Sequence, residues 1–219
     1  WGLYKVGWPH TVVEDYKSLD SHNIWLSFFN KIGCDLMKKE NLSKLILIRI
    51  DEEYISYLRK YDSKVQINSS VLHKDNKPFV GVLFEINNLK YFVPISSNKK
   101  DKLSRMFNKY VETGKKPIDM FFIEETYNDE RKLLSVLNLN NMIPVCDRAI
   151  INYNISQDKD YFLLRKEIAF CNLHKKKIIS DSKRIYNAVI THSWQSLENR
   201  CCNFKLLEEK CIYYQSQNI

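Results

Sequence analysis

Two apolar segments joined by a short asparagine turn constrain the fold of this 219-residue chain more than any other feature. Segments 79–86 and 90–94 flank the tripeptide Asn87-Asn88-Leu89. Asparagine readily takes the turn conformations that a β-hairpin requires. The pattern therefore predicts an antiparallel pair of strands, the second of which runs into a polar loop.

Strand-like runs precede helical ones along the chain. Apart from the hairpin, apolar runs with the composition of strands occur at 45–50, 119–124 and 133–145. Asp51 and Asn203 are each suited to cap a helix, and apolar residues recur at helical spacing after residue 158. Residues 100–117 are polar and lysine-rich, and we expect a helix or a long loop that ends near Gly114. Because the predicted strands come first along the chain and the predicted helices come mostly last, we expect an α+β fold with an antiparallel sheet.

The first 36 residues differ from the rest in composition. They hold three of the four Trp and three of the five Gly, and their net charge is −1, whereas the remainder carries +9. Met37 opens a segment that looks like a natural start. We therefore expect residues 1–36 to be an N-terminal extension, and residues 37–219 to form a single domain that folds without it. The alternative is an appendage whose aromatic side chains pack on the domain; these are Trp1, Trp8, Trp25, Phe28 and Phe29.

Charge and composition narrow the functional classes. The formal charge of +8 favours a polyanionic partner. No apolar run approaches the length of a membrane span and no secretory signal is visible, so the sequence predicts a soluble, cytoplasmic protein. The six cysteines form no CxxC pair or Cys/His cluster, and the acids are interleaved with lysines, so we expect neither a metal site nor a cofactor. The absence of a Gly-rich phosphate loop disfavours nucleotide triphosphate chemistry.

The stretch 91–100, YFVPISSNKK, carries the strongest chemical signal. An apolar strand ends there, and the hydroxyls of Ser96 and Ser97 and the ammonium groups of Lys99 and Lys100 follow at once. Hydroxyls donate hydrogen bonds to phosphate oxygens and lysine neutralises their charge. A strand end is a rigid place from which to present such a loop, although the same residues also occur in ordinary solvated loops.

These residue types are sufficient for RNA cleavage without a metal ion. The ribose 2′-hydroxyl is an internal nucleophile, so a protein need only orient it, take its proton, stabilise the charged phosphorane and protonate the leaving 5′-oxygen. Lysine, tyrosine and serine can share these tasks in a preorganised site.

From about Leu45 to Cys211 the chain resembles the ToxN/AbiQ family, the endoribonuclease toxins of type III toxin–antitoxin and phage-abortive systems. Five segments carry the resemblance in the family's order: EEYISYLRKYDSKV (52–65), NKPFVGVLFEINNLKYFVPISSNKK (76–100), LNLNNMIPV (137–145), LLRKEIAFCN (163–172) and CNFKLLEEK (202–210). Each segment by itself is a modest match to the family, whereas the five segments in this order are a specific one.

The resemblance implies a compact, bent antiparallel sheet similar to the Kid/MazF toxin barrel, surrounded by helices. It also implies sequence-specific, metal-independent cleavage of mRNA that leaves a 2′,3′-cyclic phosphate and a 5′-hydroxyl. The implied partner is an antitoxin RNA of repeated pseudoknots, which the toxin processes and then holds in a closed toxin–RNA assembly. The alternatives are a non-catalytic RNA-binding module and an RNase toxin restrained by a protein antitoxin.

The resemblance also implies roles for individual residues. The catalytic positions carried over from the family are Tyr54, Lys77, Ser96, Ser97 and Lys99. Tyr54 shares an apolar helix face with its neighbours, so a packing role is the alternative there. Asn98 stands where the family usually has proline, which leaves both Lys99 and Lys100 as candidates for the phosphate contact. The residues expected to bind RNA, or else to form solvated surface, are Lys100, Lys102, Lys175, Lys176, Lys177, Lys183 and Arg184.

Overall fold

The computed structural model describes residues 44–67, 78–97 and 101–217, which belong to a compact unit that begins at Lys44. The predictions about residues 1–36 lie outside the described residues, and the boundary at Met37 stays a prediction. Among the described residues, no helix is long and apolar enough to cross a membrane.

The first strand and helix form where their sequence signals predict them. Strand β1 (Ile46–Ile50) leads directly into helix α2 (Glu52–Arg59). The Asp51 carboxylate accepts a hydrogen bond from the backbone N–H of Glu53 at 2.9 Å, which satisfies one of the free donors at the helix start. Glutamates in the first turn add a favourable interaction with the helix dipole.

The asparagine turn forms the predicted hairpin. Asn87 and Asn88 have φ values of 50° and 64°, a backbone conformation that Asn tolerates better than most residues, and they join β3 (Glu85–Ile86) to β4 (Leu89–Ser97). The single strand predicted over 79–86 is divided, because β2 (Phe79–Gly81) lies between β1 and β4 whereas β3 pairs with β4. The turn thus contains two residues rather than three.

A second hairpin, which the sequence analysis did not identify, extends the sheet. Strands β5 (Met120–Tyr127) and β6 (Glu130–Asn138) pair through a turn at Asn128 and Asp129, whose φ values are 48° and 61°. The predicted run 119–124 covers only the first part of β5. The Asn-Asp dipeptide was the local signal for this turn.

The strands form one antiparallel sheet in the order β5-β6-β4-β2-β1-β8, where β8 spans Ile150–Ile151. Strands β3 and β7 (Ile143–Val145) pair with β4 as well. The run predicted as one strand over 133–145 is divided between β6 and β7 by a short 3₁₀ turn at Leu139–Asn141. The predicted α+β class with an antiparallel sheet is confirmed.

The predicted barrel is wrong, because within the described residues the sheet is open, with β5 at one end and β8 at the other. Closure would require these two edge strands to pair. Strand β8 has only two residues, and β5, which pairs with β6 alone among the described strands, contacts helix α4.

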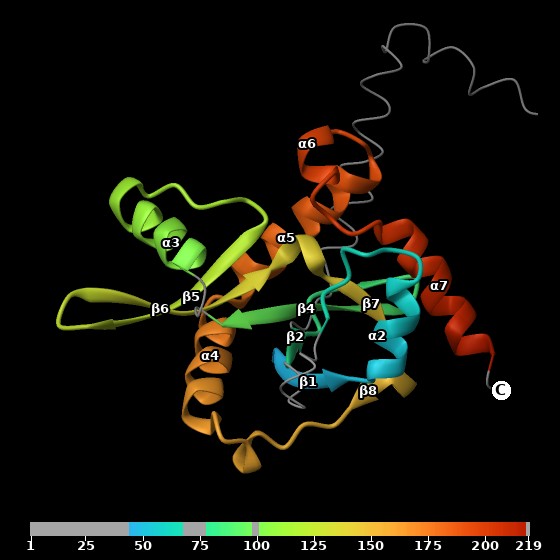
Figure 1. Cartoon of the computed structure of the whole chain (residues 1–219), viewed down its shortest axis with the longest axis horizontal. Helices are drawn as coiled ribbons and strands as arrows, with labels where there is room; N and C mark the ends of the chain where they lie inside the picture. The colour runs from blue at the N-terminus through green and yellow to red at the C-terminus, as the bar shows by residue number, and fades with distance from the viewer. Residues whose placement is uncertain (1–43, 68–77, 98–100, 218–219) are drawn as a thin grey trace, which may run out of the picture. The chain divides into compact units, whose positions relative to one another are not determined.

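Five more helices surround the sheet in the described part of the chain: α3 (Asp101–Thr113), α4 (Tyr161–Leu173), α5 (Lys175–Ile190), α6 (Gln195–Glu198) and α7 (Phe204–Ser216). The residues after 100 therefore form a helix, and Gly114 follows it with φ 69°. Asn203 caps α7 as predicted, accepting from the backbone N–H of Leu206 at 3.2 Å. Figure 1 shows α3 and α4 on either side of the β5–β6 hairpin, and α2 beside α7 at the other end of the sheet.

A buried polar cluster ties β4 to two helices. The hydroxyls of Tyr91 and Tyr186 both donate to the Glu208 carboxylate, at 2.8 and 2.6 Å. Phe204 stacks on Tyr186 at 5.7 Å between ring centroids. Burial, and next the Glu208 charge, raise the pKa of Tyr91 well above its usual range, so this hydroxyl stays a donor. The cluster anchors β4 near its N-terminal end, where Tyr91 is the third residue of the strand.

Glu167 makes the stability of this unit depend on pH. Its side chain lies in the core, with 3% of the residue exposed, and burial raises its pKa from 4.5 to about 7 against a smaller opposing effect of Ser135. Between these two pH values the folded state binds more protons than the unfolded state, so stability falls as pH rises from about 4.5 to 7 and then levels off.

We therefore expect Glu167→Gln to remove this slope. Above pH 7 the variant should be more stable than the parent by about 3 kcal/mol, and near pH 4.5 the two should be alike. Urea unfolding of both proteins across this pH range measures the difference. A difference in unfolding free energy that does not change with pH would contradict the assignment.

Candidate functional site

The end of strand β4 presents the two hydroxyls that the sequence analysis singled out. Ser96 and Ser97 are the last residues of β4 and pair with Val136 and Ser135 of β6. Both serines are half-buried. Pairing on β6 fixes the backbone of both serines, so their side chains leave a rigid strand rather than a free loop.

Two amide side chains orient the Ser96 hydroxyl. The Ser96 Oγ accepts hydrogen bonds from Asn138 Nδ2 at 2.7 Å and from Gln66 Nε2 at 3.2 Å. Asn138 Nδ2 also donates to Gln66 Oε1 at 3.0 Å. A hydroxyl oxygen accepts two hydrogen bonds and donates one. Since both acceptor positions are filled by protein groups, the Ser96 hydrogen is left to donate to a ligand.

The serines line a pocket of about 720 Å³ between the end of the sheet, helix α3 and the segment after α2. Three cationic residues, Arg59, Lys64 and Lys102, are part of its lining, and the described residues that line it include no carboxylate. Leu103 and Met106 of α3 provide an apolar side. A basic pocket with an apolar wall is suited to an anionic ligand that also has a flat or apolar part.

Hydrogen bonds to Arg59, Asn141 and Cys201 hold the segment after α2 in place. Arg59 donates to the backbone carbonyls of Ser63, at 3.1 Å, and of Val65. Asn141 donates to the Lys64 carbonyl at 2.7 Å, and the Lys64 ammonium group donates to the Cys201 carbonyl at 2.7 Å. These bonds position Gln66, which the segment carries toward Ser96.

Tyr54 does not line this pocket. It is fully buried on α2, its hydroxyl donates to the Pro144 carbonyl at 2.8 Å, and its ring meets the edge of Tyr214 at 4.9 Å. Burial is the largest effect that raises the pKa of this phenol well above its usual value. This geometry favours the packing role that the sequence analysis left open for Tyr54.

The other predicted residues fall into three groups. Lys102 lies in the pocket with Ser96 and Ser97. Lys77, Lys99 and Lys100 lie outside the described residues, and their roles stay predictions. The remaining predicted RNA-binding residues are on α5, away from the serine pocket: Lys175, Lys176, Lys177, Lys183 and Arg184.

Gln66 and Asn138 were not found by sequence reasoning. They are 72 residues apart in the sequence. Gln66 follows α2 and Asn138 is the last residue of β6, and neither belongs to a motif that would mark it as functional. Asn138 lies in the LNLNNMIPV segment, which carries part of the family resemblance but no predicted site residue. Only the register of β6 on β4 places it beside Ser96.

Two further findings concern metal binding and thiols in the described part of the chain. No group of three or more His, Cys, Asp or Glu residues there is close enough to hold a metal ion. The described cysteines are free and buried: Cys146, Cys171, Cys201, Cys202 and Cys211.

Comparison with known proteins gives one consistent result. A family model described as toxin ToxN of type III toxin–antitoxin systems matches residues 46–212. Endoribonuclease ToxN of Bacillus thuringiensis subsp. kurstaki is 32% identical over 179 residues, which are 77% of this chain and 84% of the relative.

Two solved structures share the fold. One is AbiQ, a lactococcal anti-phage endoribonuclease of a type III toxin–antitoxin system, with a TM-score of 0.67, 24% identity, and coverage of 80% of this chain and 100% of that one. The other comes from a bacterial type III system in which a non-coding RNA pseudoknot selectively inhibits the toxin. It has a TM-score of 0.64, 30% identity and the same coverage.

Proposed function

This chain belongs to the ToxN/AbiQ family, the endoribonuclease toxins of type III toxin–antitoxin systems, and we propose that it cleaves mRNA at specific sequences without a metal ion. The products carry a 2′,3′-cyclic phosphate and a 5′-hydroxyl. The site of action is the cytoplasm, where its growth-arresting activity serves phage defence. The observation that carries this proposal is the hydrogen bonding of the Ser96 hydroxyl in the basic pocket. Its oxygen accepts hydrogen bonds from two amide side chains, so its hydrogen is left to donate to a ligand.

The reaction proceeds by transfer within the RNA. The 2′-oxygen loses its proton and attacks the neighbouring phosphorus, the bond from phosphorus to the 5′-oxygen breaks, and that oxygen takes up a proton. Ser96 and Ser97 donate hydrogen bonds to the non-bridging oxygens, whose negative charge grows in the transition state. Lys102 supplies positive charge from the same pocket. Lys77 and Lys99, assigned by family resemblance, are the groups proposed to move protons or to bind the phosphate.

The partner of the toxin is proposed to be an antitoxin RNA of repeated pseudoknots. Support comes from the similar structure in which an RNA pseudoknot inhibits the toxin, and from the net charge of +8 on this chain. The toxin processes the repeats and binds the products in a closed toxin–RNA assembly that covers the serine pocket. Restraint by a protein antitoxin is the alternative.

The test is RNA cleavage by the purified chain in excess EDTA. We expect cleavage to continue, and the new 5′ ends to accept a phosphate from polynucleotide kinase without prior dephosphorylation. A double Ser96→Ala, Ser97→Ala variant, purified in parallel, controls for contaminating nucleases. Cleavage that requires magnesium would contradict the mechanism, and RNA binding without cleavage would favour the non-catalytic module.

Asn138 is proposed to position Ser96. Asn138→Leu keeps the size of the side chain and removes one of the two donors to Ser96 Oγ. One hydrogen bond contributes about 0.5–1.5 kcal/mol, so we expect kcat to fall roughly 2- to 13-fold with KM unchanged. Asn187→Leu on the exposed face of α5 is the matched control. A change in KM alone would assign Asn138 to substrate binding instead.

A further inference from the structure

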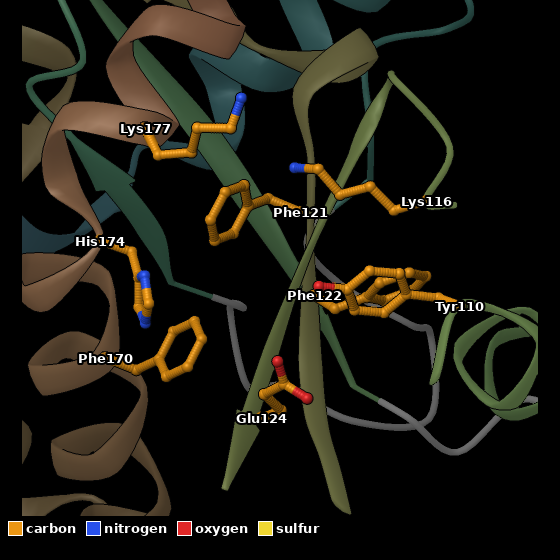
Figure 2. A pocket seen from close by; sticks show the side chains of 8 residues that line it. All are labelled: Tyr110, Lys116, Phe121, Phe122, Glu124, Phe170, His174 and Lys177. Carbon is orange, nitrogen blue, oxygen red and sulfur yellow. The ribbon is translucent and has the colours of Figure 1, made fainter. Parts of the chain in front are cut away.

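A second, smaller pocket lies between the edge strand β5 and helix α4, with a volume of about 190 Å³. Aromatic rings form two of its sides (Figure 2). On one side Tyr110 stacks on Phe122, with ring centroids 5.5 Å apart and planes at 26°. On the other, Phe170 lies against His174 at 4.2 Å. Figure 2 shows the sheet strands passing between these two pairs of rings, and consecutive residues of β5 point to opposite faces, so a planar ring in the ligand would lie against the Phe170 side.

Cationic side chains lie at one end of the same pocket. The ammonium groups of Lys116 and Lys177 bond to the two oxygens of Asp181, at 3.0 and 2.9 Å, and Arg184 approaches the same carboxylate at 3.4 Å. Figure 2 shows the two lysine side chains extending toward each other above Phe121. Three cations share one carboxylate, so the cluster has a net charge of +2 by formal count. The pocket lining also includes the Glu124 carboxylate, which is paired with Arg131 at 2.7 Å. An anion bound here would neutralise the positive charge that Asp181 does not balance.

Two members of this cluster are buried, whereas the side chains of Lys177 and Arg184 are 60% and 59% exposed. Asp181 has 2% of its side chain exposed and Lys116 has 22%. Burial lowers the pKa of Lys116, and the ion pair with Asp181 opposes that effect. Burial would raise the pKa of Asp181, but hydrogen bonds from Lys177 and Lys116 outweigh it, so this carboxylate stays ionised. Charges in a partly desolvated site attract an anion more strongly than the same charges in water.

This pocket and the serine pocket border the same two elements. Met106 of α3 and Met120 of β5 line the serine pocket, whereas Tyr110 and Phe122, farther along the same elements, line the aromatic one. Four residues of helix advance about 6 Å, and two residues of strand about 7 Å. The distance between the two pockets is therefore short enough for one RNA strand to reach both.

We propose that the aromatic pocket binds one unpaired nucleotide of RNA, with its base against the rings and its phosphate at Lys116 and Lys177. This inference rests on the proposed function, in which RNA is the partner. Stacking of a base on aromatic side chains is sequence-tolerant and adds about 1–3 kcal/mol per base. The nucleotide belongs either to the substrate strand or to the antitoxin RNA.

Binding of a fluorescein-labelled, mixed-sequence single-stranded RNA of 20 nucleotides tests the pocket. Every protein in this assay also carries Ser97→Ala, so that the RNA is not cleaved during the measurement. Phe170→Leu keeps an apolar side chain and removes the ring, and should weaken binding about fivefold or more. Lys177→Ala should reduce the slope of log affinity against log salt by about 0.7. The matched controls are Phe162→Leu, on the exposed face of the same helix, and Lys60→Ala, and both should bind as the background protein does.

Two further measurements, with Ser97 intact, identify the source of the nucleotide. If it belongs to the substrate, Phe170→Leu raises KM for cleavage and leaves kcat unchanged. If it belongs to the antitoxin, cleavage is unchanged and more antitoxin RNA is needed for inhibition. The inference is overturned if Phe170→Leu and Lys177→Ala match their controls in RNA binding, cleavage and inhibition. It is also overturned if both bind RNA normally but lose binding of 5′-AMP in equilibrium dialysis, which would indicate a site for free nucleotides.

The inference and the proposed function can fail separately. A parent chain that binds the labelled RNA but cleaves no RNA contradicts the proposed enzyme, and the binding data still decide whether the pocket holds a nucleotide. A parent chain that cleaves RNA while the pocket variants behave as controls contradicts the pocket alone.

Discussion

Ser97→Ala should lower kcat/KM for RNA cleavage on the order of 100-fold or more, since loss of one donor to a charged transition state commonly has an effect of this size. Ser97 is the last residue of β4 and lines the basic pocket next to Ser96. Folding should be unaffected, because a half-buried side chain at a strand end makes few contacts in the core. The initial rate of cleavage of a defined RNA measures the activity, and thermal unfolding followed by circular dichroism measures the stability.

The control for this change lies in the same pocket. Ser63 also lines it, but its side chain is exposed and its backbone carbonyl, not its hydroxyl, accepts the bond from Arg59. Ser63→Ala should therefore be fully active. Ser96→Thr keeps the hydroxyl and should retain most of the activity, whereas Ser96→Ala should not. If the Ser97→Ala and Ser96→Ala variants were both fully active, this pocket would not be the active site.

Phe204→Ala should have the largest effect on stability, about 3–5 kcal/mol, because it leaves a cavity where no solvent reaches. Phe204 is 1% exposed, stacks on Tyr186 and meets the edge of Tyr91 at 6.1 Å, so its ring fills the space between α7, α5 and β4. For a domain of this size the melting temperature should fall by roughly 6–20 °C. Urea unfolding at constant pH measures the free energy directly.

Ile212→Ala on the same helix is the comparison for that change. Ile212 is 54% exposed, so its truncation removes little buried surface and should change stability by less than about 0.5 kcal/mol. Equal effects of the two substitutions would mean that α7 does not pack on the sheet as described.

Local chemistry in the sequence was enough to predict several elements. Asn87 and Asn88 predicted a hairpin because few residues other than Gly and Asn tolerate a positive φ, and both residues have one. Asp51 and Asn203 predicted helix starts because a short polar side chain can bond to the free backbone donors of the first turn. The same reasoning applies to Asn128, which also has a positive φ and begins the turn of the β5–β6 hairpin.

Burial of single residues could not be read from the sequence. Tyr54 carries a phenol that suits either catalysis or packing, and its helix face alone does not distinguish the two. Its position against Pro144 and Tyr214 depends on how α2 meets β7 and α7, which are some ninety or more residues away in sequence. Likewise, the open sheet, with β5 at one end and β8 at the other, is an arrangement of distant segments that no local pattern indicates.

The sequence by itself determined the strand that ends in two serines, the order of strands before helices, and the basic charge that fits an RNA partner. Only the tertiary structure decided what surrounds those serines. Gln66, Ser96 and Asn138 come from three separate segments and meet because β6 pairs with β4 in one register and because Arg59 holds the segment after α2. A hydrogen bond between distant residues depends on geometry fixed by the whole fold, so no local pattern of residue types could predict the group that orients the Ser96 hydroxyl.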